Sequence, residues 1–362
     1  MTVRRAALAL LIYLALAVWL TWPLLPMAGS HIAGDPLDPL LNATVLYWNA
    51  VKLPLTEAWW NAPFFYPTHA VTTFTENLLG ISPFASPLLW MTGNPLLAYN
   101  VSLFLGWPLS AFALYLLAHH LTHRHDAAFV GGLIFGFTPY RASELGHIQM
   151  VSTYWLPLIV LGLHAYVETR RRRWLALFAG AWVLQALANG YMMLFTCVLI
   201  GAWVLYFCAT RDHWRRIPGI GAAFVLALIP ALFVMLRYVA VHRAEGLVRP
   251  TAEPEGFSYP LTVWYGVSTT VDFWQQFLPY GPDIQFPGAA GLILVIAGAI
   301  GAALAFSRRE ELPSPVSAYV RTALAAIAVF GGVAVIFLYG HGPWHGSVAG
   351  FTLRMTDAKR PF

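Results

Sequence analysis

Charge is the scarcest ingredient of this sequence. Charged residues occupy only 10% of its 362 positions, hydrophobic residues occupy 59%, and the mean hydropathy is +0.63. A soluble domain carries about 25% charged residues. This deficit excludes a soluble globular protein. The formal net charge of +5 is also too small to indicate a nucleic-acid-binding protein, so no nucleic-acid partner is expected.

Cysteine and metal-binding motifs are scarce as well. The two cysteines, Cys197 and Cys208, fall inside one apolar run, where they are expected to be small buried residues rather than a disulfide. No CxxC or HExxH spacing occurs. The motifs therefore predict no cofactor, and a divalent cation at the site stays an open alternative.

Long apolar runs are what the sequence has in abundance. They are continuous rather than alternating, which favours transmembrane helices over a barrel. The predicted fold class is an all-α polytopic membrane protein with about nine transmembrane helices. The expected spans are 6–25, 96–117, 127–139, 150–167, 174–188, 191–209, 217–238, 288–306 and 319–338.

The arginines predict how these spans are oriented. More than half of the 21 basic residues fall in short segments that share one side if the N-terminus is cytoplasmic. The pair Arg4 and Arg5 opens the chain, and a retained first helix is preferred over a cleaved signal peptide. Gly132 and Gly136 lie four residues apart in the shortest span, which predicts close helix packing there.

Two long segments, 27–95 and 239–287, are then expected outside. Both are dense in tryptophan, tyrosine, phenylalanine and proline, which suits helices lying in the membrane interface. An aromatic belt that only anchors the protein is the alternative. We expect one transmembrane domain over 1–338 and an outer tail over 339–362. Truncation is one interpretation of that short tail.

Acids in the first outer segment are candidates for catalysis. Asp38 precedes Pro39 and is expected to be the N-cap of a helix whose dipole favours an ionised carboxylate. Such a carboxylate can accept a proton from an acceptor hydroxyl. Asp35 is the second choice. Glu76 either faces the same cavity or is a solvated acid at a helix start.

Two outer segments combine cations with acids. In 140–149, Arg141 could hold a phosphate through paired hydrogen bonds, or it could pair with Glu144 for stability alone. At the start of the segment 239–287 and on its flank, four residues run against the positive-inside trend and therefore require an anionic partner, namely Arg237, His242, Arg243 and Arg249. Neighbouring glutamates could supply that partner as well as a lipid phosphate could.

Taken in order, these segments resemble a known class. The pieces are Gly34 to Asn42, Asn61 with Phe65-Tyr66-Pro67, Glu76 to Gly80, Gly93-Asn94-Pro95, Tyr99-Asn100, Phe135 to Arg141, Gly146 to Gln149, Asn189-Gly190-Tyr191, Gly246 with Arg249 and Glu253, and Phe286-Pro287-Gly288. The chain resembles a poorly characterised branch of bacterial multi-span membrane glycosyltransferases of the GT-C class. This resemblance covers most of its length.

The resemblance implies a function and a site. GT-C enzymes transfer a sugar, usually with inversion, from a polyprenyl-phosphate carrier on the outer face of the bacterial cytoplasmic membrane. Asp38 best matches their catalytic acid, followed by Asp35 and Glu76. The implied substrate-binding residues are Arg141, His147, Gln149, Tyr191, Arg243, Arg249 and Glu253. The implied partners are the polyprenyl-phosphate sugar donor and membrane lipid.

Two other functions stay open at this point. One is a transporter or flippase for a lipid-linked glycan, although the spans hold little polar chemistry beyond His164 and Gln185. The other is a non-catalytic scaffold that keeps the GT-C fold. The sequence does not predict the sugar, the acceptor or the oligomeric state.

Overall fold

The computed structural model describes residues 3–34, 36–208 and 213–247, residue 288, scattered positions over 290–297, and 344–348 and 351–355. The chain divides into two compact units. Unit 1 comprises Met1–Ala202 and Arg215–Val248, and unit 2 comprises Trp203–Trp214 and Arg249–Phe362. The predicted span 319–338 lies outside the described residues, as do most of 239–287, 288–306 and 339–362.

All the secondary-structure elements described in unit 1 are helices, joined by turns and loops. Its elements, including the part of α12 and η2 shared with unit 2, are α1 (Val3–Leu20), α2 (Leu24–Met27), α3 (Asp38–Val51), α4 (Glu57–Trp60), the 3₁₀ helix η1 (Val71–Phe74), α5 (Ser82–Thr92), α6 (Pro95–Thr122), α7 (His125–Gly136), α8 (Pro139–Ser143), α9 (Ile148–Val151), α10 (Trp155–Thr169), α11 (Arg172–Ala188), α12 (Gly190–Phe207), η2 (Trp214–Arg216) and α13 (Ile217–Ala244). In unit 2, β1 (Trp344–Val348) pairs antiparallel with β2 (Phe351–Met355), a hairpin that the apolar pattern did not predict.

Five helical segments within the described residues are long and apolar enough to cross a membrane, which marks the chain as a membrane protein. They are Val3–Leu20, Pro95–Thr122, Ile148–Thr169, Gly190–Phe207 and Trp214–Ala244. The predicted count of nine is not confirmed within the described residues, because the spans 288–306 and 319–338 lie mostly or wholly outside them. Helices also form at two further predicted spans, but α7 has 12 residues and α11 has 17, or about 18 and 26 Å. Both are shorter than the roughly 30 Å hydrocarbon core.

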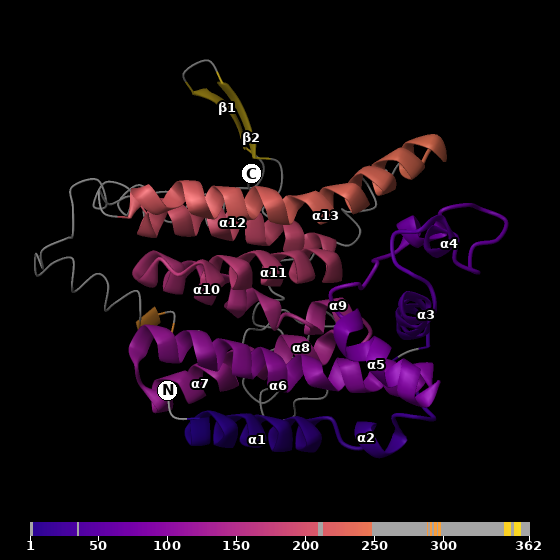
Figure 1. Cartoon of the computed structure of the whole chain (residues 1–362), viewed down its shortest axis with the longest axis horizontal. Helices are drawn as coiled ribbons and strands as arrows, with labels where there is room; N and C mark the ends of the chain where they lie inside the picture. Colours follow the sequence, from indigo (N-terminus) through magenta and orange to yellow (C-terminus); the bar gives the residue numbers. More distant parts are fainter. Residues whose placement is uncertain are drawn as a thin grey trace, which may run out of the picture. The chain divides into compact units, whose positions relative to one another are not determined.

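The long helices of unit 1 run side by side, and α11 packs against both α10 and α13 (Figure 1). Helix α3 is seen end-on in the same view and therefore lies across them. Its inner face is buried, whereas Leu40, Tyr47 and Val51 are exposed. An interfacial position for this helix stays a prediction from the aromatic composition of segment 27–95.

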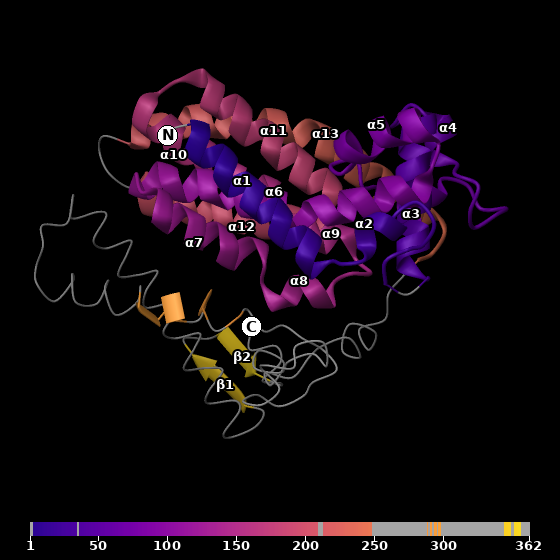
Figure 2. The same ribbon diagram turned by 90° about the horizontal axis from the view of Figure 1, so that it is seen from below.

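The two ends of unit 1 differ in chemistry. One end, called here the arginine-bearing end, carries the starts of α1, α7, α11 and α13, and His120 Nε2 lies 3.0 Å from Glu168 Oε2 there. The opposite, loop-bearing end carries α2 to α5, as the view from below also shows, and α8 and α9 lie between α7 and that end (Figure 2). At that end Asn100 Nδ2 donates to the backbone oxygens of Ala28 and His31.

Helices α6 and α7 approach closely at two glycines, as their spacing predicted. A Cβ at Gly132 would lie 2.6 Å from the backbone oxygen of Ala111 and 2.3 Å from Tyr13 Oη. A Cβ at Gly136 would lie 2.4 Å from Ala111 Cβ. Real Cβ atoms do not approach this closely, so the two helices depend on glycine at both positions.

We expect Gly136→Ala to destabilise unit 1 by about 1–3 kcal/mol, because the new methyl group forces α7 away from α6. Gly131→Ala on the same helix is the control, since its Cβ would have no neighbour nearer than 3.7 Å. That change should be neutral or slightly stabilising. Thermal unfolding in detergent measures both variants. Equal melting temperatures for the two would contradict the close approach.

Candidate functional site

Asp38 begins helix α3 at the loop-bearing end. It was predicted to be the N-cap, but the structure has Leu37 at that position and Asp38 in the first helical turn, with Pro39 beside it. An acid in the first turn still interacts favourably with the helix dipole. Because the carboxylate is not engaged as a cap, it is available to a partner from another segment.

That partner is His147, more than a hundred residues away in the chain. His147 Nε2 lies 3.2 Å from Asp38 Oδ2, and His147 Nδ1 lies 2.8 Å from Glu144 Oε2. The two segments meet because Asn42 Nδ2 donates to the backbone oxygen of Gly146 at 3.4 Å. The result is one imidazole held between two carboxylates.

This cluster, Asp38–His147–Glu144, is open on one side. The side chain of Asp38 is 59% exposed and that of His147 is 47% exposed, whereas Glu144 is mostly covered. The hydrogen bond with Glu144 raises the pKa of His147, and the charges of Glu144 and Asp38 act in the same direction against partial burial. The cluster therefore presents an accessible carboxylate beside an imidazole that favours its cationic form.

Arg141 is placed differently from its predicted role. It is 4% exposed, and its guanidinium donates to the backbone oxygens of Phe135 and Val151 and to Thr153 Oγ1. Burial lowers the pKa of Arg141 to about 10, so the group stays protonated near neutrality. It connects the end of α7 with the end of α9 and with Thr153 in the turn that follows. Contact with a carrier phosphate stays a prediction, and it would require the guanidinium to leave these partners.

Glu76 caps helix α12. Both of its carboxylate oxygens lie 3.2 Å from the backbone nitrogen of Gly190, and burial raises the pKa of Glu76 although this hydrogen bond opposes the shift. The following residue, Tyr191, is exposed. Asn189 Nδ2 lies 3.0 Å from Met150 Sδ, which places this group near α9.

Asp38 and Glu76 belong to opposite ends of α3. Asn49, near the end of that helix, donates to the backbone oxygen of Asn77 at 2.7 Å. The helical rise from residue 38 to residue 49 is about 16 Å. The two carboxylates are therefore too far apart to act on one bond.

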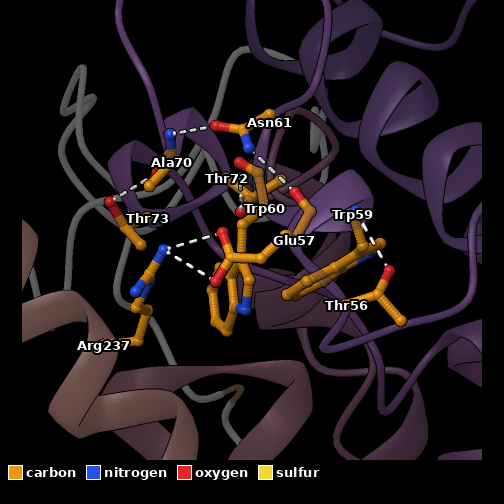
Figure 3. A network of polar contacts seen from close by, with 9 residues as sticks. All are labelled: Thr56, Glu57, Trp59, Trp60, Asn61, Ala70, Thr72, Thr73 and Arg237. Atoms are coloured by element: carbon orange, nitrogen blue, oxygen red, sulfur yellow. Dashed lines mark hydrogen bonds and ion pairs between the residues drawn. The ribbon is translucent and has the colours of Figure 1, made fainter.

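Helix α13 is joined to the first outer segment by the network in Figure 3. Arg237 Nη2 lies 3.2 and 3.0 Å from the two carboxylate oxygens of Glu57, and the guanidinium lies 5.9 Å from the Trp60 ring centroid. Next along α13, Tyr238 donates to the backbone oxygen of Thr75. A glutamate is thus the partner of Arg237, but it comes from the first outer segment and not from the neighbouring glutamates of the second.

Arg243 lines a cavity of about 460 Å³ along α13. The described lining combines this guanidinium and the His242 imidazole with mainly apolar groups. The other lining residues are Met235, Tyr238, Val239, Gly246 and Leu247. Since His242 Nε2 lies 2.8 Å from the backbone oxygen of Thr73, the cavity adjoins the Glu76 end of α3 rather than the Asp38 end.

The remaining candidates are placed as follows. Gln149 lies on α9 with a buried Oε1 that has no hydrogen-bond partner in the described structure. Asp35, Arg249 and Glu253 lie outside the described residues. Among residues that are described, no three of the types His, Cys, Asp and Glu are grouped so as to hold a metal ion.

Comparison with known proteins identifies the family. The family model described as "Domain of unknown function (DUF6311)" matches residues 82–360, which is most of the chain. The chain belongs to the DUF6311 family. Searches of the curated proteins and of the solved structures found no match. Within this DUF6311 protein, His147 and Glu144 lie inside the matched region, whereas Asp38 and Glu76 precede it.

Glu144 is the cluster residue whose partner the sequence analysis misassigned. It was considered only as a partner for Arg141 at a spacing of three, and it pairs instead with His147 at the same spacing. A histidine three residues after a glutamate was the available signal. The predicted Arg141–Glu144 pair does not form, because the Arg141 side chain is buried inside the protein.

Stability should depend on pH through His147. Its folded-state pKa is raised, so the cluster's contribution is complete below the unfolded value of about 6.5 and is lost as the pH rises through the folded value. We expect the melting temperature of the natural protein, relative to His147→Gln, to fall over that window. A constant difference between the two proteins across the same pH range would contradict the double carboxylate pairing.

Proposed function

We propose that this DUF6311 protein transfers a sugar from a polyprenyl-phosphate-linked donor to an acceptor hydroxyl at the extracytoplasmic membrane face. The GT-C resemblance motivates the proposal, and one observation carries it. That observation is the accessible Asp38 carboxylate held by His147 at the loop-bearing end.

The cluster has the groups that such a transfer requires. Asp38 acts as the general base that accepts the proton of the acceptor hydroxyl as it attacks the anomeric carbon. The bond from that carbon to the phosphate oxygen breaks, and negative charge develops on the carrier phosphate. His147 lies next to Asp38 and favours its cationic form, so it stabilises that charge. Glu144 holds the imidazole of His147 in position between the Asp38 carboxylate and the carrier phosphate.

Arg243 is assigned no part in this step. Its cavity adjoins the opposite end of α3, about 16 Å along the helix from Asp38. The carrier phosphate is bonded directly to the reacting carbon, so its cation must lie close to the base. His147 meets that requirement better than Arg243.

The separation of charge in unit 1 supports the orientation. The loop-bearing end carries the cluster, and the opposite end carries Arg4, Arg5, Arg124 and the run 170–173. The positive-inside rule assigns the arginine-bearing end to the cytoplasm. With the N-terminus inside, the cluster faces the compartment in which polyprenyl-linked sugars of the GT-C class are used.

Asp38→Asn should reduce transfer by about 100-fold or more, because an amide cannot accept the proton. Asp126→Asn is the matched control, since Asp126 is also an exposed, cation-paired aspartate but lies at the arginine-bearing end. Proteoliposomes containing the purified chain, radiolabelled undecaprenyl-phosphate hexoses and extracted membrane acceptors provide the assay.

A second pair of variants distinguishes the role of Asp38 from that of Glu76. Glu76→Gln should keep most of the transfer, because Glu76 lies beside the Asn49 end of α3, and Asn49 is about 16 Å of helix away from Asp38. If Glu76→Gln abolishes transfer and Asp38→Asn does not, the reaction centre is at the α12 cap instead. Movement of the labelled lipid across the bilayer without sugar transfer would favour a flippase and overturn the proposal.

A further inference from the structure

The segment that carries Glu144 and His147 has little regular structure of its own. It lies between α7 and α10 and contains only α8, with five residues, and α9, with four. Helices of fewer than about 12 residues are marginal by themselves in water. The position of the His147 imidazole must therefore come from contacts that this segment makes with its surroundings.

Arg141 makes such contacts on both sides of the segment. Its Nε donates to the backbone oxygen of Phe135, in the last turn of α7, at 3.2 Å. On the other side, Nη1 donates to the backbone oxygen of Val151 and Nη2 donates to Thr153 Oγ1 at 2.6 Å. The guanidinium also lies 5.2 Å from the Phe135 ring centroid. One side chain thus closes the loop that contains Glu144 and His147.

The loop closed by Arg141 is fixed on the long helix α6. A Cβ at Gly106 would lie 2.6 Å from Val151 Cγ1 and 3.2 Å from the backbone oxygen of Val151, so α9 packs directly on α6 at this glycine. Seven residues earlier on α6, the Tyr99 hydroxyl donates to the backbone oxygen of Leu145 at 3.4 Å. Arg141 therefore fastens the loop to a 28-residue helix rather than to another turn.

The partners of Arg141 are all neutral oxygen atoms. Its side chain is 4% exposed, and none of the described ion pairs includes it. Burying a charge costs free energy even when it is hydrogen-bonded, so the conformation that the group fixes explains it better than stability does. A guanidinium donates in several fixed directions at once, which the single ammonium of lysine cannot reproduce.

We propose that Arg141 is a positioning residue, which holds the His147 imidazole between the carboxylates of Asp38 and Glu144. It acts through His147 and touches no substrate. Its consequence for sugar transfer rests on the proposed function, because there the imidazole and the Asp38 carboxylate must face the same reacting bond. Its effect on the pairing of His147 is independent of that function.

Melting across a range of pH tests this role without an activity assay. The natural protein and His147→Gln should differ by a pH-dependent amount, because the described groups that pair with His147 are the carboxylates of Asp38 and Glu144. In an Arg141→Lys background, which keeps the charge, the same comparison should lose most of its pH dependence. An arginine that only stabilises the fold would lower both melting temperatures equally and leave that dependence intact.

Milder variants keep the test decisive if Arg141→Lys does not fold. Thr153→Val keeps the volume and removes one acceptor of the guanidinium, so it should lose part of the pH dependence. Thr153→Ser restores the hydroxyl and should regain it. Thr196→Val is the matched control, since Thr196 is also buried but its hydroxyl donates to the backbone oxygen of Met192 in its own helix. That variant should keep the full pH dependence.

Kinetics of transfer then distinguish positioning from substrate binding. Arg141→Lys should lower kcat by roughly 10- to 100-fold, the scale of a small misplacement of reacting groups, and leave KM for the lipid donor unchanged. A raised KM with an unchanged kcat would assign Arg141 to the carrier phosphate and overturn the proposal.

The melting comparison also decides the proposal by itself. Undiminished pH dependence in both Arg141→Lys and Thr153→Val would overturn the positioning role, and so would an equal loss in Thr196→Val. If the natural protein transfers no sugar, the proposed function fails, and the melting comparison still decides the role of Arg141.

Discussion

The near absence of charge from the long helices is the constraint on which the rest of this structure depends. Lipid offers no hydrogen bonds, so backbone groups must be satisfied within helices and ionised side chains are confined to helix ends. Every described ion pair of unit 1 lies at one end of the bundle or the other. Chemistry that needs charge is thereby restricted to two surfaces.

Asparagines hold the loop-bearing surface together without adding charge. Asn49 donates to the backbone oxygen of Asn77 and accepts from Trp59 Nε1, and Asn100 is bonded to three backbone groups within 28–33. An amide offers both donors and acceptors, so one buried side chain can satisfy two loops at once. These bonds fix the ends of α3, and they thereby place Asp38 and Glu76 apart.

Local patterns predicted what depends on neighbours in the sequence. Hydropathy located all the described long helices, and the spacing of Gly132 and Gly136 predicted the close approach of α7. The pairing of Asp38 with His147 joins segments more than a hundred residues apart, and no periodicity encodes that contact. Likewise, Arg141 in the sequence looks like any outer cation, and only tertiary packing decides that it is buried.

The same constraint explains why the two surfaces should bind different partners. At the loop-bearing end, His147 lies between two carboxylates, and that of Asp38 is exposed. At the arginine-bearing end, donors exceed acceptors among the described residues, so the local deficit is of anions.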